Sequence, residues 1–421
     1  MNAARATQTM RHAMAWVSAG NLVSKLLMFA ANIWIANRLL DAAYGSVSVA
    51  FTVVNYIALV LFVGLDTITT REAAGAAPQH LRRLAGELGV IRLGLVALAI
   101  GLTLVMALCL PAPAGGLTGL YALSFVPLVL YAVNLFYGVE WAWPITAYFI
   151  GGRVVYCGLV CALVHTTHDA AAVPIAFALA LCAENVFLFL LWQRRYGVEH
   201  PLRPRSLSPR WRAAVPVTAS SAFLLLHENA GMLAVFVLCG AATTGVYAAG
   251  YRLVYIAVSL TGLLSYVFLA RFTRVLRDQP ATARALFRGV IVCALVGGAL
   301  ASIAGILLAR PVVRLLYDPV YQPSAAIIVI LAWQMVAAPA RVIAYQTLNA
   351  CGMQRRIVPW CAGGAAVSVS AVVLGCGWAG APGAAMGTVL GELASMVVLV
   401  VAADRIVKRL ATLRDTCTQN P

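Results

Sequence analysis

Three basic side chains lie inside stretches of sequence that are otherwise apolar enough to cross a membrane. Lys25 is at the centre of "NLVSKLLMFAANIWIA", residues 21–36, and Arg252 and Arg341 occupy similar positions further along the chain. A charge at the middle of a bilayer is costly, and such residues usually mark a substrate or ion pathway. Each cation is therefore a candidate for binding an anionic ligand or for pairing with a buried acid.

Other polar side chains recur at helical spacing in the same kind of segment. At about 100° per residue, the polar residues of four apolar segments each fall within a strip roughly 60° to 80° wide. The four sets are Ser18, Asn21, Lys25 and Asn32; Ser48, Thr52, Asn55 and Asp66; Arg252, Tyr255, Ser259 and Tyr266; and Gln334, Arg341, Tyr345 and Asn349. A water-filled path needs such stripes, whereas isolated ion pairs do not. We expect the stripes to converge on a central cavity.

The residue types in these stripes indicate which ligand the cavity would bind. Arginine offers a planar fork to phosphate oxygens and lysine a point charge, while amides and aromatic faces suit the hydroxyl groups of sugars. The expected substrate-binding residues are Lys25, Arg252, Arg341, Asn21, Asn32, Asn55, Tyr255, Gln334 and Tyr345. The predicted ligand is anionic and glycan-like.

Acidic residues in the apolar segments are candidates for ion coupling. His227 and Glu228 are adjacent in "LLLHENAG", and Asp66 lies in the second stripe. We expect these three to exchange a proton or bind a cation during transport. The alternative is a purely structural role, in which Lys25 pairs with Asp66, or Arg252 with Glu228.

Composition places the chain in a membrane. Of its 421 residues 62% are hydrophobic and only 10% charged, and the mean hydropathy is +0.89. Apolar runs long enough to cross a bilayer occur near 13–38, 45–70, 88–110, 117–138, 145–165, 171–193, 213–238, 244–270, 287–309, 324–349, 357–378 and 382–403. This pattern predicts an all-α integral membrane protein with about twelve transmembrane helices.

The distribution of basic residues predicts the orientation of these spans. With the N-terminus inside, 23 of the 30 basic residues fall in inner segments, three in outer segments and four within spans. Arg92 is counted with the inner loop before the third span. Arg153 is one of the four within spans, and it lies near the inner end of the fifth. The positive-inside rule then puts both termini in the cytoplasm. The basic residues of the inner segments thus explain the net charge of +16, and we expect no nucleic-acid partner.

The spans divide evenly about a proline- and arginine-rich segment at 194–212. We expect an N-terminal lobe at 1–193, a basic cytoplasmic linker at 194–212, a C-terminal lobe at 213–403 and a tail at 404–421. An offset of 200 residues places "AAYGSVSVA" (42–50) over "ATTGVYAAG" (242–250), which suggests duplicated lobes with six helices each. Small residues at a spacing of four predict close helix packing; they are Gly383, Gly387 and Gly391 in one span, and Gly297, Ala301 and Gly305 in another.

Catalysis is not expected from this chain. The outer loops are short, no GxxxxGK[ST] sequence is present to bind ATP, and the ten cysteines show no CxxC pair or zinc-like cluster. We interpret the cysteines as packing thiols and predict no metal or cofactor. Glu184 and Glu392 also lie within or near spans, and we expect only packing or pairing from them.

Several segments resemble a known family. The segments "ANRLLDAAYGSVSVAFTVVNYIALVLFVGLDTITTREAA" (36–74), "LARPVVRLLYDPVYQPSAAIIVILAWQMVAAPARVIAYQTLNACGMQRR" (308–356) and "GAPGAAMGTVLGE" (380–392) are similar to those of bacterial oligosaccharide flippases, which serve O-antigen and exopolysaccharide synthesis. These proteins belong to the multidrug, oligosaccharidyl-lipid and polysaccharide exporter superfamily. The resemblance covers nearly the whole chain.

The resemblance implies an alternating-access transporter in the bacterial inner membrane. Its cargo would be a polyprenyl-pyrophosphate-linked oligosaccharide, moved from the cytoplasmic to the periplasmic leaflet through a cavity lined by cations. Membrane lipids, a coupling proton or sodium ion and a polysaccharide polymerase would be its partners, with Glu228 as the coupling residue.

Two alternatives stay open. A cation-coupled drug or metabolite antiporter of the same fold would need an acidic cavity, and the superfamily's drug exporters often carry acids in the first span, where this chain has Lys25. A membrane enzyme such as a polymerase or glycosyltransferase would need reactive groups in a sizeable loop.

Overall fold

The computed structural model describes residues 2–199 and 207–419, in which all secondary structure is helical. The side chains of 2–15, 207–213, 354, 411–419 and parts of 260–281 lie outside this description. The α-helices are α1 (Asn2–Ala73), α2 (Pro78–Cys109), α3 (Ala114–Tyr121), α4 (Val133–Gly138), α5 (Ala142–Leu163), α6 (Ala172–Arg195), α7 (Leu207–Asp278), α8 (Pro280–Leu316), α9 (Ser324–Leu331), α10 (Gln334–Ala350) and α11 (Gln354–Gln419). The short 3-10 helices are η1 (Ala122–Leu130), η2 (Thr167–Ala171) and η3 (Pro319–Tyr321).

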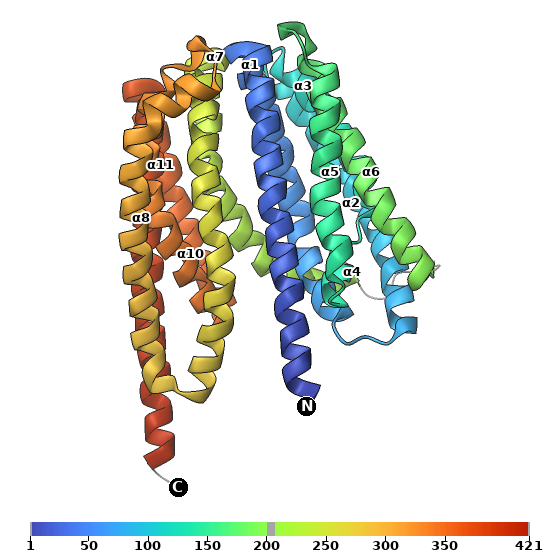
Figure 1. The fold of residues 1–421 in the computed structure, drawn as a ribbon, viewed down its shortest axis with the longest axis vertical. Coiled ribbons are helices and arrows are strands. Elements are labelled where there is room, and N and C mark those ends of the chain that lie inside the picture. Colours follow the sequence, from blue (N-terminus) through green and yellow to red (C-terminus); the bar gives the residue numbers. More distant parts are fainter. Residues whose placement is uncertain (1, 200–206, 420–421) are drawn as a thin grey trace. The chain divides into compact units, whose positions relative to one another are not determined.

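Three helices are too long to be single spans. α1 and α7 have 72 residues each and α11 has 66, whereas about 20 residues cross a bilayer. Each contains a non-helical break, at Leu40 in α1, at Gly240 in α7 and at Ala379 and Gly380 in α11. Figure 1 shows the chain turning back at these breaks. Each long helix therefore contributes two spans.

This geometry confirms the predicted all-α membrane fold. Among the described residues, seven helices are long and apolar enough to cross a membrane, and α1, α7 and α11 count twice among them. The bent pair of α9 and α10 and the segment from α3 to α4 fill the two remaining positions of the predicted twelve.

Two predicted spans are broken rather than continuous. The run at 117–138 comprises α3, η1 and α4, because Pro127 lies inside η1 and regular helix resumes only at Val133. In the run at 324–349, α9 and α10 meet at an angle of 43° between Leu331 and Gln334. Pro339 lies further on, inside α10.

Contacts divide the chain into two compact units, residues 1–221 and 222–421. The boundary falls within α7, because the start of this helix packs into the first unit. There Gly64 of α1 lies against Ala214 and Thr218 so closely that a Cβ atom would clash. The second unit is built on a core that joins the end of α7 to α8, α10 and α11, with Phe272, Phe287 and Leu348 fully buried.

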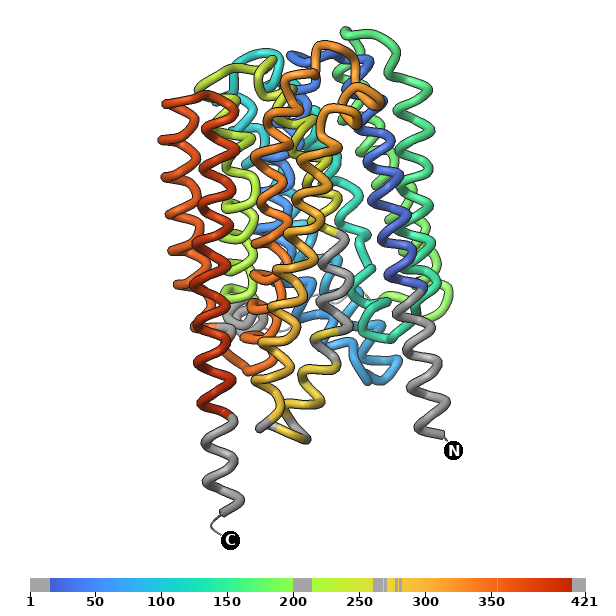
Figure 2. Tube along the Cα trace, turned by 60° about the vertical axis from the view of Figure 1, so that its left-hand side comes forward, coloured from blue at the N-terminus to red at the C-terminus, as the bar shows by residue number. Residues whose placement is uncertain are grey.

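Small residues let the two halves of α11 approach closely, as the sequence predicts. A Cβ atom at Gly383 would meet the backbone of Gly375, and one at Gly387 would meet the backbone of Ala371. Figure 2 shows these halves side by side. The expectation for the other stripe is wrong at Gly297, which faces open space, because its neighbour Gly298 packs against α10 instead.

Candidate functional site

Arg341 forms the centre of a buried charge cluster in the second unit. Its Nε donates to Oε1 of Glu392 at 2.5 Å, and its Nη2 donates to Oε1 of Glu228 at 3.0 Å. The side chains of Arg341 and Glu392 are only 5% and 4% exposed, whereas Glu228 is 33% exposed. A guanidinium can bond two carboxylates at once because its donors point in several directions of one plane.

His227 extends this cluster through the second oxygen of Glu392. Its Nε2 lies 2.5 Å from Oε2 of Glu392, and its backbone carbonyl accepts a hydrogen bond from Oγ of Ser368 at 3.3 Å. The Nδ1 atom is buried without a hydrogen-bond partner among the described residues. The chain of contacts therefore runs from Glu228 through Arg341 and Glu392 to His227.

Three helices supply these residues. His227 and Glu228 come from α7, Arg341 from α10, and Glu392 from the second half of α11. Adjacent residues of a helix point about 100° apart, yet both residues of α7 join the cluster because each contacts a different helix. With neutral His227 the cluster has one excess negative charge, and one added proton would make it neutral.

A second buried ion pair lies in the first unit. Arg92 of α2 donates through Nη2 to Asp66 of α1 and through Nη1 to the carbonyl of Leu128 at 3.3 Å. Its guanidinium carbon is 4.5 Å from the ring centre of Tyr131, which is cation–π geometry. The carbonyl of Leu128 is accessible to Arg92 because η1 replaces a regular helix here.

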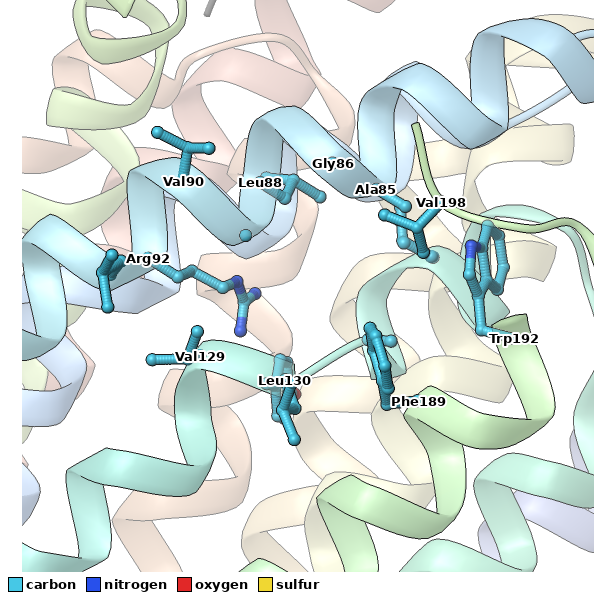
Figure 3. A pocket seen from close by; sticks show the side chains of 15 residues that line it. Ala85, Gly86, Leu88, Val90, Arg92, Val129, Leu130, Phe189, Trp192 and Val198 are labelled. Carbon is cyan, nitrogen blue, oxygen red and sulfur yellow. The ribbon is translucent and has the colours of Figure 1, made fainter. Parts of the chain in front are cut away.

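A cavity of about 270 Å³ adjoins this pair between α2, η1 and α6. Figure 3 shows Arg92 on its wall among apolar side chains such as Leu88, Leu130 and Phe189. A cavity of such lining suits hydrocarbon better than a sugar. We assign it no part in binding a glycan.

A third group of polar side chains joins α5 and α6. Arg153 lies 6.0 Å from the ring centre of Phe177, and a Cβ atom at Gly152 would clash with the carboxylate of Glu184. Nη1 of Arg153 and Oε1 of Glu184 are both buried without a hydrogen-bond partner among the described residues. Although Arg153 lies near the inner end of the fifth predicted span, its side chain turns into the protein.

The structure places the predicted residues of α1 as follows. Asn21 and Lys25 are half-buried, Asn55 is exposed, and Asn32 is buried with its Nδ2 donating to the carbonyl of Met28 at 2.7 Å. The amide nitrogen of Asn32 is thus engaged by its own helix.

The predicted residues of α7 and α10 differ in their surroundings. Arg252 and Tyr345 are half-buried, Gln334 is buried and Tyr255 is exposed. Tyr255 also stacks on Tyr251, with ring centres 5.8 Å apart. The side chain of Tyr266 lies outside the described residues.

The buried pairs differ from those considered from sequence. Asp66 forms its ion pair with Arg92, and Glu228 forms its pair with Arg341. Arg92 was expected in a loop and is instead 1% exposed within α2. That error arose because α2 begins at Pro78, well before the most apolar part of the segment.

Glu392 was expected only to pack or to pair, and the structure shows that it pairs with Arg341. It follows Gly391 at the end of the small-residue stripe, and a buried carboxylate beside a glycine contact surface needs a cationic partner. The position of Glu392 next to Gly391 therefore indicated that it has a cationic partner, but nothing in the sequence identified Arg341 as that partner.

Comparisons with known proteins agree with this architecture. A model of the family described as polysaccharide biosynthesis protein matches residues 11–274, while a comparison with curated proteins gives no match. An inward-facing multidrug resistance MATE transporter of the MOP superfamily superposes with a TM-score of 0.76 at 15% identity, over 92% of this chain and 95% of the other.

Two further solved structures have the same fold. A MOP superfamily transporter from Pyrococcus furiosus, described as having a binding pocket of reverse polarity, gives a TM-score of 0.69 at 14% identity, over 95% of this chain and 96% of the other. A mutant of a Vibrio cholerae MATE transporter gives 0.66 at 16% identity, over 96% and 99%. At these identities the likeness concerns the fold.

Proposed function

The chain belongs to the polysaccharide biosynthesis protein family and has the MOP superfamily transporter fold, and from this premise we propose that it is a flippase. Its cargo is a polyprenyl-pyrophosphate-linked oligosaccharide, which it moves from the cytoplasmic to the periplasmic leaflet of the bacterial inner membrane by alternating access. The family match carries this proposal, since a surface polysaccharide is built on a lipid carrier that must cross the membrane.

The cations within the spans support an anionic cargo. Lys25 in the first unit and Arg252 in the second are half-buried on helices that cross the membrane. An ammonium and a guanidinium suit the pyrophosphate of the carrier or an acidic sugar.

Arg341 serves a different purpose in this proposal. Two carboxylates already bond its guanidinium, so we assign it to ion coupling rather than to the cargo. One proton removes the excess negative charge of the cluster, whereas a sodium ion would compete with the guanidinium of Arg341 for Glu228 and Glu392. The geometry thus favours a proton as the coupling ion.

Transport in proteoliposomes tests the cargo. We expect the wild type to translocate a polyprenyl-pyrophosphate oligosaccharide, Lys25→Ala to lose at least tenfold in rate, and Lys25→Arg to keep most of it. Lys408, the other lysine of the chain, is exposed and provides the control Lys408→Ala, which should transport normally. Efflux of a cationic dye without glycolipid movement would contradict the proposal and favour the antiporter.

A separate experiment tests the coupling ion. Glu228→Gln keeps an oxygen acceptor for Arg341 but cannot take up a proton, so we expect it to transport without responding to a pH gradient. The wild type should respond to a pH gradient and ignore a sodium gradient. A sodium-driven wild type would show that the coupling assignment is wrong, while leaving the cargo assignment intact.

A further inference from the structure

Two cysteines far apart in sequence are in contact in the second unit. Sγ of Cys239 lies 3.6 Å from Sγ of Cys376, and the two residues are 137 positions apart. Both precede a helix break, at Gly240 in α7 and at Ala379 and Gly380 in α11. The contact therefore joins two helix ends on the same side of this unit.

The geometry leaves little distance for a covalent bond to close. A disulfide has a sulfur–sulfur distance of about 2.05 Å, so the sulfurs must approach by roughly 1.5 Å for the bond to close. The Sγ of Cys239 also lies 3.8 Å from the position of a Cβ atom at Gly380, where no side chain intervenes.

The charge distribution of this unit indicates which side of the membrane the thiols occupy. The end opposite to them carries the basic residues Arg271, Arg274, Arg284, Arg288, Arg355, Arg356, Arg405, Lys408 and Arg409. The thiol end carries only Arg310 and Arg314 among its described basic residues, near the end of α8. By the positive-inside rule the thiols face the extracytoplasmic side, where oxidising conditions allow disulfides to persist.

We propose that Cys239 and Cys376 form a disulfide bond that ties α7 to α11 at their extracytoplasmic ends. The inference rests on the contact and on the distribution of basic residues, and it does not depend on the cargo. It goes beyond transport, since it assigns a covalent modification to the resting protein.

The oxidant would be the disulfide of an extracytoplasmic thiol oxidoreductase. Cys239 is partly exposed and Cys376 is buried, so Cys239 attacks first as a thiolate. A mixed disulfide forms and one oxidant sulfur leaves as a thiolate. The thiolate of Cys376 then attacks Sγ of Cys239, the new disulfide closes, and the oxidant leaves as a dithiol that has gained two electrons and two protons.

Counting oxidised thiols in the full-length protein tests the proposal. Cells expressing it are quenched in acid, all thiols are blocked with N-ethylmaleimide in denaturant, and the protein is then reduced and labelled with a polyethylene-glycol maleimide. We expect two labels on the wild type and none on Cys239→Ser or Cys376→Ser. The matched control is Cys109→Ser, which removes an exposed cysteine at the end of α2 and should retain two labels.

Two results would overturn the inference. One is a wild type that takes up no label, both as isolated and after a membrane-impermeant oxidant has been added to spheroplasts. The other is a bond that an impermeant phosphine cannot reduce until the membrane is solubilised, since that would place the thiols on the inner side. Mass spectrometry of the linked peptides identifies the pair directly.

Discussion

Arg341 and Glu392 illustrate what a buried charge requires of its neighbours. Each is almost fully buried, and each bonds two other members of the same cluster. A buried ion pair often contributes little net stability, but removing one partner leaves an uncompensated charge in a region of low dielectric. The loss of one member of this cluster should therefore cost more free energy of unfolding than any intact pair of its residues contributes.

Glu392→Gln is expected to destabilise the protein by roughly 3–5 kcal/mol, the cost of breaking a buried pair from one side. His227 would lose its charged acceptor, and Arg341 would keep only the bond to Glu228, which is one-third exposed. Thermal unfolding in detergent, followed by the loss of the monodisperse peak, measures the effect.

Glu228→Gln provides the comparison at the same cluster. Glu228 has one bond to Arg341 and is one-third exposed, so we expect a clearly smaller drop in unfolding temperature than for Glu392→Gln. Equal drops in unfolding temperature would contradict this prediction, because they would show that both carboxylates are equally important for balancing the charge of Arg341.

The sequence identified most of these charges but could not pair them. His227, Glu228 and Arg341 are conspicuous because each interrupts an apolar run, and all three lie in the cluster. Their partners depend on which helices become neighbours, and helix periodicity carries no information about that. For this reason the sequence did not predict which residues Glu392 and Arg92 pair with.

At the scale of helices, α1 and α7 share a backbone feature. Leu40 has φ 62° and ψ −176°, and Gly240, which is 200 residues later, has φ 83° and ψ 176°. The sequence comparison used this same offset for the two halves. This region of backbone conformation is nearly restricted to glycine. The break in α1 is therefore strained at Leu40, whereas the break in α7 is unstrained because it has Gly240.

Leu40→Gly is expected to stabilise the protein by about 1–2 kcal/mol by relieving this strain, and Gly240→Leu to destabilise it by a similar amount. Unfolding temperatures of the two variants measure the difference. A Leu40→Gly protein that melts below the wild type would indicate that packing of the leucine, which is 38% exposed, outweighs the strain.

Close packing within α11 gives a second prediction at this scale. Gly387→Leu would force a side chain into the backbone of Ala371, and overpacking of this kind typically costs about 1–3 kcal/mol or more. Gly377→Leu is the matched control on the same helix, since nothing lies within 4 Å of its Cβ position. We expect only Gly387→Leu to reduce the yield of folded protein and its unfolding temperature.

Sequence reasoning predicted the number of spans but not their regularity. Hydropathy measures length and apolarity, and by those measures 117–138 and 324–349 are ordinary spans. The 3-10 geometry of η1 and the 43° bend between α9 and α10 depend on local packing. Irregular backbone is possible at membrane depth only where the protein surrounds it or where it lines a water-filled cavity.

For the whole molecule, the asymmetry of basic residues predicts the topology. We expect both termini in the cytoplasm, so a fluorescent protein fused after residue 421 should fold and fluoresce. Alkaline phosphatase fused after Ala242, just beyond the break in α7, should be active because it is exported. An active phosphatase at residue 421 would reverse the assignment, and with it the expected direction of transport.

The cluster around Arg341 also bears on the order in which the chain is made. Synthesis proceeds from the N-terminus, so α7 and α10 enter the membrane before the second half of α11 exists. Until that last span arrives, His227 and Arg341 lack Glu392, and Arg284 and Arg288 lack Asp404, which each of them bonds through Nε and Nη2. In an unfinished chain Arg341 thus has Glu228 as its acid partner but lacks Glu392, and the cluster is complete only when the final helix is inserted.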